Sequence, residues 1–354
     1  MIREKIKQLR PREETYTRPE DKIQSFLLSE ATSASTYFEG VIAACHNNSR
    51  LPETKFKQVI MKDSYVNQFL SAADKATGKS VFATTKKSIK EKQQILWDFA
   101  QVCKSKLPSG KSDAGAGQSK KGVSPTWKKL TTKRKDTSKA DILVSNNRTS
   151  VKGPSAQLMS GEQKETRATI LAALEISGES GDLKEKLLSE VDKFVTSTKT
   201  VGADINSRVL KQMSVGDATR TGNKRAKEIV DQQESMKKEI TKVFESAFKD
   251  PNVGRAFAQE AMTGYEKFGG KAFGMPGDTD GEATHMLIWD YRMDRLKFTP
   301  INSALISKSA AQMLVRPDLK SNSYKRSGVK AGYSFYQSLR VSVEVLLNKQ
   351  GELE

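Results

Sequence analysis

The sequence predicts a mixed α/β (α+β) fold with a long helical insertion, and three patterns lead to this prediction. Apolar residues recur at helical spacing through much of the chain before residue 105. Two short β-rich runs flank a turn at 145–148, which is the pattern of a hairpin. A third run, at 283–289, is apolar enough to form a buried strand. Helices and strands are therefore expected to alternate along the chain.

Three helical stretches are expected before residue 105. The first covers 34–46, where Phe38, Val41 and Cys45 recur on one stripe. The second covers about 55–75, and the third covers 88–104. Each would bury one apolar face.

The hairpin is the most specific local prediction. Strand-like runs at 140–144 and 149–152 are separated by residues that favour a turn. A helix is expected to begin after the hairpin, at Ser155 or Ser160. Further on, the heptad-like apolar spacing of 182–250 is typical of an inserted helical arm.

These patterns divide the chain into six regions. The regions are a flexible N-terminal arm at 1–20, a helical region carrying Glu39 at 21–104, a basic Gly/Ser/Lys loop at 105–139, the hairpin and its following helix at 140–180, a helical insertion at 181–263, and the remaining core strands with a basic C-terminal region at 264–354. The loop at 105–139 has almost nothing to bury, so we expect it to be irregular.

The chain is strongly basic. Its 354 residues include 60 Lys and Arg against 42 Asp and Glu, which gives a net charge of +18. Cationic side chains that neutralise phosphates release condensed counterions, and this release dominates non-specific affinity for nucleic acids. The charge therefore favours a nucleic-acid partner over a merely well-solvated surface. The charge does not show whether the protein cuts, packages or coats a nucleic acid.

The composition also excludes several classes of protein. With 36% hydrophobic residues the chain can build a packed core, so wholesale disorder is excluded. No stretch approaches the roughly 20 apolar residues of a membrane span, and the N-terminus lacks the apolar segment of a signal peptide. Cys45 and Cys103 cannot build a disulfide framework or a zinc cage by themselves. We expect no membrane partner, and a protein of the reducing cytoplasm or of a particle assembled there.

Two basic segments are candidate DNA contacts. They contribute Lys128, Lys129, Lys133, Arg134 and Lys135 in the loop and Lys325, Arg326 and Lys330 in the C-terminal region. A basic loop with an aromatic residue can hold a phosphate backbone and stack a base on Trp127. Trp127 can equally anchor a solvated loop to the core. The C-terminal segment is either a phosphate contact or a solvated basic turn.

Three residues in order could form a hydrolytic site: Glu39 on a helix, Asp141 at the start of the hairpin and Lys152 on its second strand. Antiparallel pairing brings Asp141 and Lys152 within about 5–8 Å of each other. Strand alternation puts Ser150 on the same face as Lys152. Phosphodiester hydrolysis needs a hard cation held by carboxylates, and positive charge beside the reacting phosphate. A purely structural interpretation is the alternative. In it, Glu39 is a solvated helix residue, Asp141 caps a turn, Lys152 is an exposed strand residue, and Gln157 caps the helix that follows the hairpin.

These residues resemble the PD-(D/E)XK nuclease superfamily, which includes restriction endonucleases and Holliday-junction resolvases. The resemblance rests on Phe38-Glu39 and on the segments at 138–142, 149–153 and 156–161. The pattern looks most like uncharacterised nuclease-like proteins of tailed bacteriophages.

The resemblance implies a restriction-endonuclease-like mixed-sheet core flanked by helices, and a metal-dependent DNA endonuclease. It implies a catalytic set of Glu39, Asp141, Ser150, Lys152 and Gln157, with Mg²⁺ or Mn²⁺ held by Glu39, Asp141 and the main-chain carbonyl of Val151. The implied partners are DNA and other phage proteins, and the implied location is the host cytoplasm or the virion. The oligomeric state is open, with a homodimer among the options.

The sequence departs from the family at Ser150, which stands where the family carries its second acid. Either another carboxylate replaces it, with Glu39 the first candidate and Glu162 or Glu165 behind it, or the site is weakened. The alternative function is therefore a catalytically inactive DNA-binding virion or structural protein that retains the nuclease scaffold. A helical capsid scaffold is a further alternative, suggested by the region 182–250.

Overall fold

A computed structural model describes residues 34–75, 87–114, 122–131, 137–153, 157–161, 163–179, 181–190, 192–193, 224–269, 281–290, 295–326 and 329–343. Over 315–343 the description covers the backbone. The predicted N-terminal arm at 1–20 lies outside these residues.

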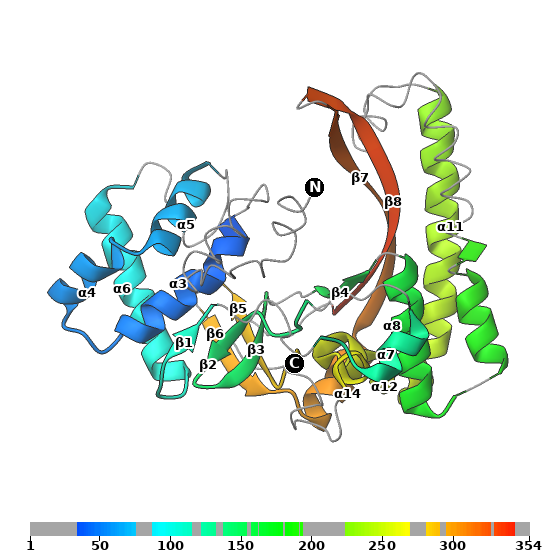
Figure 1. Cartoon of the computed structure of the whole chain (residues 1–354), viewed down its shortest axis with the longest axis horizontal. Helices are drawn as coiled ribbons and strands as arrows, with labels where there is room; N and C mark the ends of the chain where they lie inside the picture. Colours follow the sequence, from blue (N-terminus) through cyan, green and yellow to red (C-terminus); the bar gives the residue numbers. More distant parts are fainter. Residues whose placement is uncertain are drawn as a thin grey trace, which may run out of the picture.

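A mixed sheet of five strands lies at the centre of the molecule (Figure 1). The strands, in spatial order, are β1 (Ser112–Asp113), β2 (Ile142–Val144), β3 (Asn147–Lys152), β5 (His285–Asp290) and β6 (Arg295–Pro300). All neighbouring strands are antiparallel except β3 and β5, which are parallel. The predicted mixed α/β class is confirmed.

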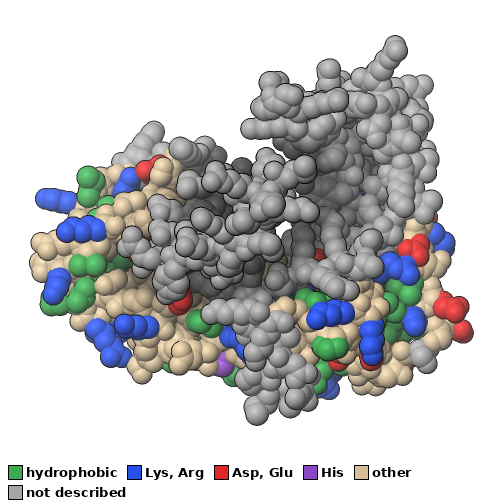
Figure 2. All heavy atoms as spheres, in the orientation of Figure 1, with side chains coloured by type: hydrophobic (Ala, Val, Ile, Leu, Met, Phe, Trp, Pro, Cys, Tyr) green, Lys and Arg blue, Asp and Glu red, His purple; other side chains and the backbone are tan. Residues whose placement is uncertain are grey.

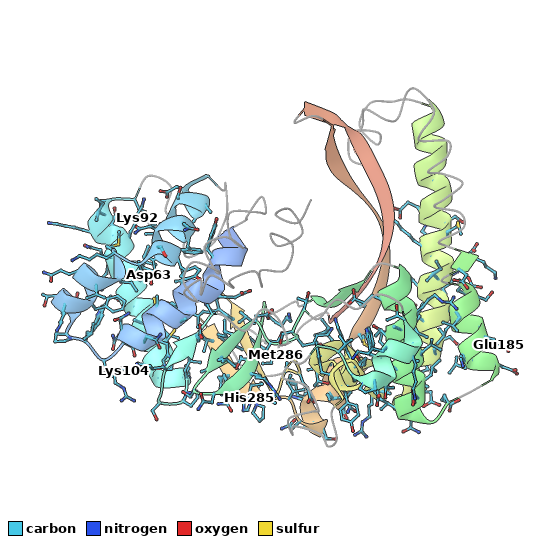
Figure 3. All side chains as sticks on the ribbon, viewed as in Figure 1. Asp63, Lys92, Lys104, Glu185, His285 and Met286 are labelled. Carbon is cyan, nitrogen blue, oxygen red and sulfur yellow. The ribbon has the colours of Figure 1, made fainter. Side chains whose placement is uncertain are left out.

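Helices pack on both faces of this sheet (Figure 1). One group comprises α3 (Ala34–Asn48), α4 (Glu53–Ile60), α5 (Ser64–Lys75) and α6 (Ile89–Lys106), and the other comprises α8 (Gln163–Ser177), α11 (Lys224–Phe248), α12 (Pro251–Thr263) and α14 (Ser303–Ala311). Strand β5 serves both cores, because Leu287 and Trp289 pack with the first group whereas Met286 and Ile288 pack with the second. Figure 3 labels His285 and Met286 between the two groups.

The expected helices at 34–46 and 88–104 are confirmed as α3 and α6. Helix α6 begins with a capping box, in which the Ser88 side chain accepts from Glu91 N and the Glu91 side chain accepts from Ser88 N. The helical stretch expected over about 55–75 is confirmed, and the chain divides it into α4 and α5 with a break between them. Asp63 Oδ1 accepts a hydrogen bond from Val66 N at 3.0 Å, which favours a new helix start at the break.

The predicted hairpin is confirmed as β2 and β3. Its two turn residues, Ser145 (φ 49°) and Asn146 (φ 69°), adopt the left-handed conformation that this tight turn requires. The helix start expected at Ser155 or Ser160 is wrong, because 157–161 form strand β4 (Gln157–Gly161) and α8 begins at Gln163. Strand β4 pairs with β8 (Val329–Val343), which in turn pairs with β7 (Met313–Arg326) in a second sheet.

The loop expected at 105–139 contains more structure than its composition suggests. It contributes β1 to the main sheet and forms helix α7 (Pro125–Leu130). Ser124 caps α7 by accepting from Trp127 N, and Trp127 is buried at 2% exposure. Of the two interpretations of Trp127, the anchor to the core is therefore confirmed and base stacking is not. Residues 115–121 and 132–136 lie outside the described part of the chain.

The region 181–263 contributes to the second core. Residues 182–190, α11 and α12 are helical, and 194–223 lie outside the described residues. Phe244 of α11 and Phe257 of α12 lie in the same cluster as Met286 of the central sheet. Helix α12 contacts α8 and α14, so it is packed into the body of the protein. A short helix, α13 (Tyr265–Phe268), follows α12.

Strands β7 and β8 form a long curved hairpin that extends away from the central sheet, with α11 beside it (Figure 1). None of the helices within the described residues is both long and apolar enough to cross a bilayer.

Candidate functional site

Glu39 is held in place by its two neighbours on α3. The Phe38 ring stacks on the Trp289 ring of β5, with centroids 3.5 Å apart and an interplanar angle of 10°. On the other side, Gly40 lies so close to α5 that an added Cβ would come within 2.5 Å of Tyr65 Cγ. The two contacts fix α3 against both the sheet and α5. Glu39 is thereby carried to the sheet at a defined position.

Asp141 is fixed by the hairpin that follows it. Its backbone N–H donates to Thr149 O at 2.9 Å. Its Oδ2 atom accepts from Val151 N at 2.7 Å and from Ser150 Oγ at 3.1 Å. Asp141 Oδ1 makes no hydrogen bond or ion pair with the described residues. One carboxylate oxygen is thus used to orient the side chain.

Lys152 faces the same carboxylate. Its Nζ lies 3.6 Å from Asp141 Oδ2, and both side chains retain partial exposure, at 21% for Lys152 and 28% for Asp141. Ser150 and Lys152 therefore lie on the face of β3 that meets Asp141, as strand alternation predicts, while Val151 packs against the core beneath α3.

The electrostatics of Glu39 shows that it belongs to this group. The pKa of Glu39 is raised to about 8, chiefly because the carboxyl is buried and also because Asp141 lies nearby, whereas Lys152 lowers this pKa. Glu39 makes no hydrogen bond or ion pair within the described part of the chain. The arrangement is two carboxylates and one ammonium group in a partly buried site.

This set of groups fits a divalent cation. Mg²⁺ is commonly held by one or two carboxylates while it keeps several waters. Glu39 forms no ion pair with a cation of the described residues, and two carboxylates that repel each other gain most from a shared cation. The described residues contain no group of three or more His, Cys, Asp or Glu that would form a protein-only cage. A site here would therefore depend on water and main-chain oxygens as well.

The remaining acids expected near Ser150 are not brought to it. Glu165 pairs with Lys267, with Oε1 and Nζ 3.1 Å apart, and Glu162 lies outside the described residues. Gln157 is not at a helix start as expected but in β4, where its backbone is paired with Ser342. Nothing is described of the Gln157 side chain.

The predicted DNA contacts fall on two separate elements. Lys128 and Lys129 are exposed on α7, and Lys325, Arg326 and Lys330 lie at the far end of the β7–β8 hairpin. Lys133, Arg134 and Lys135 lie outside the described residues. On the face shown in Figure 2, further Lys and Arg side chains gather along the outer edge of the α3–α6 group.

A second group of charges beside the site has no clear signal in the sequence. The pKa of Lys139 is lowered to about 8, chiefly because the side chain is buried and also because Lys267 and Lys152 lie nearby. Lys139 Nζ donates to Ala261 O at 3.0 Å. Glu260 is 2% exposed and accepts from the backbone of Glu266 and Lys267 at 2.7 and 3.3 Å, and burial raises its pKa to about 7. From the sequence, the spacing around Glu260 predicts only that this residue lies on a helix.

A cavity of about 560 Å³ lies elsewhere, between α8, α12, α13 and α14. Its lining includes Arg255, Glu266 and Ser303, and none of the residues of the Glu39–Asp141–Lys152 group.

Comparison with known proteins gave no match: no family model, no curated protein and no solved structure is similar to this chain.

Proposed function

We propose that the protein is a metal-dependent DNA endonuclease with a PD-(D/E)XK-like site. The observation that carries the proposal is the convergence of Glu39, Asp141 and Lys152 from three separate segments of a strongly basic chain. The order of elements supports it. A helix bearing the first acid, an antiparallel hairpin bearing the second acid and the lysine, and a flanking helix are what the resemblance implies.

Glu39 and Asp141, with the main-chain carbonyl of Val151, are the groups proposed to hold Mg²⁺ or Mn²⁺. When bound, such an ion polarises a phosphoryl oxygen and lowers the pKa of a water molecule. Lys152 would orient the attacking water and offset negative charge that develops on the phosphate. Ser150 contributes through Asp141, because its hydroxyl donates to Oδ2 and so leaves the other oxygen free to bind a ligand. We give Gln157 the role of positioning the water or phosphate.

DNA, other phage proteins and a location in the host cytoplasm or the virion belong to the same proposal. Lys128, Lys129 and the far end of the β7–β8 hairpin would contact the backbone without reading bases.

A plasmid-nicking assay tests the activity. The parent protein is expected to relax supercoiled DNA with Mg²⁺ or Mn²⁺ and not with EDTA, and Asp141→Asn and Lys152→Gln are expected to lower the rate by about 100-fold or more. The matched controls are Asp98→Asn and Lys104→Gln, which change the same charges on the exposed face of α6. A parent protein that is inert on supercoiled, linear and branched DNA with either metal would refute the proposal.

One observation favours a second candidate, a DNA-binding virion or structural protein without turnover. Ser150 adds no negative charge where a third carboxylate would strengthen the metal site. In that case the parent, Asp141→Asn and Lys152→Gln would all bind DNA alike and none would cut it.

A further inference from the structure

The β7–β8 hairpin is much longer than the strands of the central sheet. Its strands are 14 and 15 residues long. At about 3.3 Å per residue, a strand of this length spans roughly 45 Å. Pairing continues along almost the whole length, from Met313 with Val343 to Arg326 with Val329, with one irregularity near the far end. The hairpin thus forms an arm, which projects from the body in Figure 1.

One face of the arm begins in the protein core, at Met313. Met313 is 5% exposed and lies in the same cluster as Ile240 and Phe244 of α11. Strand alternation places Val315, Pro317 and Leu319 on the face that Met313 begins. Their partners on β8 are Val341, Leu339 and Gln337, so this face carries no charged residue as far as the irregularity. Helix α11 contacts β7, which agrees with an apolar face on that side.

The opposite face has a different composition. It carries Arg316 opposite Arg340, then Asp318 opposite Ser338, then Lys320 opposite Tyr336. Asp318 is the only acid between residues 313 and 343, against six Lys and Arg. The register therefore places Arg316, Lys320 and Arg340 together on the face opposite the one that Met313 begins.

Two of these cations, Arg316 and Arg340, occupy directly opposite register positions. Like charges at such positions destabilise a sheet, and a bound anion offsets that cost. A polyanion with regularly spaced negative charges fits a row of basic residues. Each phosphate that these residues neutralise also releases counterions.

The base of the arm is also connected to the candidate site. Strand β4, which follows β3 and Lys152 in the chain, pairs with β8, and Ser160 of β4 is the partner of Arg340. DNA lying along the arm would thus approach the end of the sheet from which Lys152 projects.

We propose that the face of the arm carrying Arg316, Lys320 and Arg340 is a binding surface for the phosphate backbone of duplex DNA. The identity of the partner rests on the proposed function. The surface goes beyond that proposal, because it assigns DNA binding to the length of the arm and to residues that contribute nothing to the Glu39–Asp141–Lys152 group.

Salt dependence of DNA binding tests this surface. Affinity of the full-length protein for a duplex oligonucleotide is measured in EDTA over a range of salt concentrations, so that cleavage plays no part. The triple variant Arg316→Gln/Lys320→Gln/Arg340→Gln is expected to bind at least about tenfold more weakly, and its slope of log K against log salt is expected to be smaller by about 2–3. The matched control, Lys90→Gln/Lys104→Gln/Lys106→Gln, removes three exposed charges from α6 and should leave the slope within about 1 of the parent.

Two further variants keep the test decisive. If the triple variant does not fold, as judged by circular dichroism, Lys320→Gln alone should reduce the slope by about 0.9, and Arg316→Lys/Arg340→Lys should retain it. Equal slopes for the parent and the arm variants would overturn the inference, as would a parent that does not bind duplex DNA. A parent that binds through the arm but never nicks DNA would refute the nuclease proposal and leave this surface standing.

Discussion

Glu39 is the residue whose protonation depends most directly on the fold of the site. Its pKa rises from 4.5 to about 8 because the carboxyl is buried and lies near Asp141. A carboxyl whose pKa is raised by folding favours the folded state when it is protonated. Its contribution to stability is therefore full below pH 4.5 and is lost as the pH rises through 8.

Replacing this carboxyl by an amide should remove that pH dependence. In EDTA, Glu39→Gln is expected to match the parent in stability at pH 4 and to exceed it by about 1–3 kcal/mol at pH 8.5, after allowance for partial solvent screening. Urea unfolding at the two pH values measures the difference. If the difference in stability between parent and variant is the same at both pH values, the Glu39 carboxyl is not in the environment described.

Ser150 stands where the proposed nuclease site would carry a further acid, and a substitution there is informative. Its hydroxyl lies 3.1 Å from Asp141 Oδ2, and the residue is 2% exposed. Ser150→Asp would place a third carboxylate against the other two, so the variant should lose about 1–3 kcal/mol in EDTA and regain much of it in saturating Mg²⁺. Thermal unfolding with and without Mg²⁺ measures this. Ser150→Ala is the control, because it loses only a hydrogen bond and should show no added response to Mg²⁺ beyond that of the parent.

At the scale of elements, the contact between α3 and α5 sets where Glu39 lies. A Cβ at Gly40 would come within 2.5 Å of the Tyr65 ring, so Gly40→Ala should destabilise the protein by about 1–3 kcal/mol although alanine favours helices. The same change should lower nicking activity, since it displaces the turn of α3 that carries Glu39. Gly153→Ala is the control, because nothing lies within 4 Å of its added Cβ. Equal stability of Gly40→Ala and Gly153→Ala would contradict the close packing of α3 on α5.

The elements that could be predicted from the sequence are those with strong local signals. The stripe of apolar residues in α3 and the turn residues between β2 and β3 each specify their own structure, so the relative positions of Asp141, Ser150 and Lys152 follow from the hairpin alone. Strand β4 could not be predicted, because its pairing partner lies about 180 residues later in β8. The position of Glu39 could not be predicted either. It depends on the packing of Phe38 on Trp289, which is also a contact between distant segments.

The basic loop at 105–139 shows a different reason for failure. Its composition indicates a linker, but Val123 and Trp127 suffice to bury α7 against α8 and Phe268. The group around Lys139 and Glu260 could not be predicted either, because nothing in the local sequence distinguishes a buried charged residue from an exposed one.

At the scale of the whole molecule, two cores share one central sheet. Leu287 lies in the core with α3 and Ile288 lies in the core with α12, on consecutive positions of β5. Leu287→Ala and Ile288→Ala are each expected to cost about 2–5 kcal/mol. Because the two cores meet on the same strand, unfolding followed by tryptophan fluorescence and by far-ultraviolet circular dichroism should coincide in both variants. Separate transitions for the two probes would show that the helical groups unfold independently.

The proposed activity depends above all on a divalent cation between Glu39 and Asp141. The most direct measurement is anomalous X-ray scattering from crystals of the full-length protein grown with Mn²⁺. We expect an anomalous peak within about 2.5 Å of a Glu39 oxygen and an Asp141 oxygen, beside Lys152, and no such peak in Asp141→Asn. Well-ordered Glu39 and Asp141 side chains with no peak between them at saturating Mn²⁺ would contradict the proposed site.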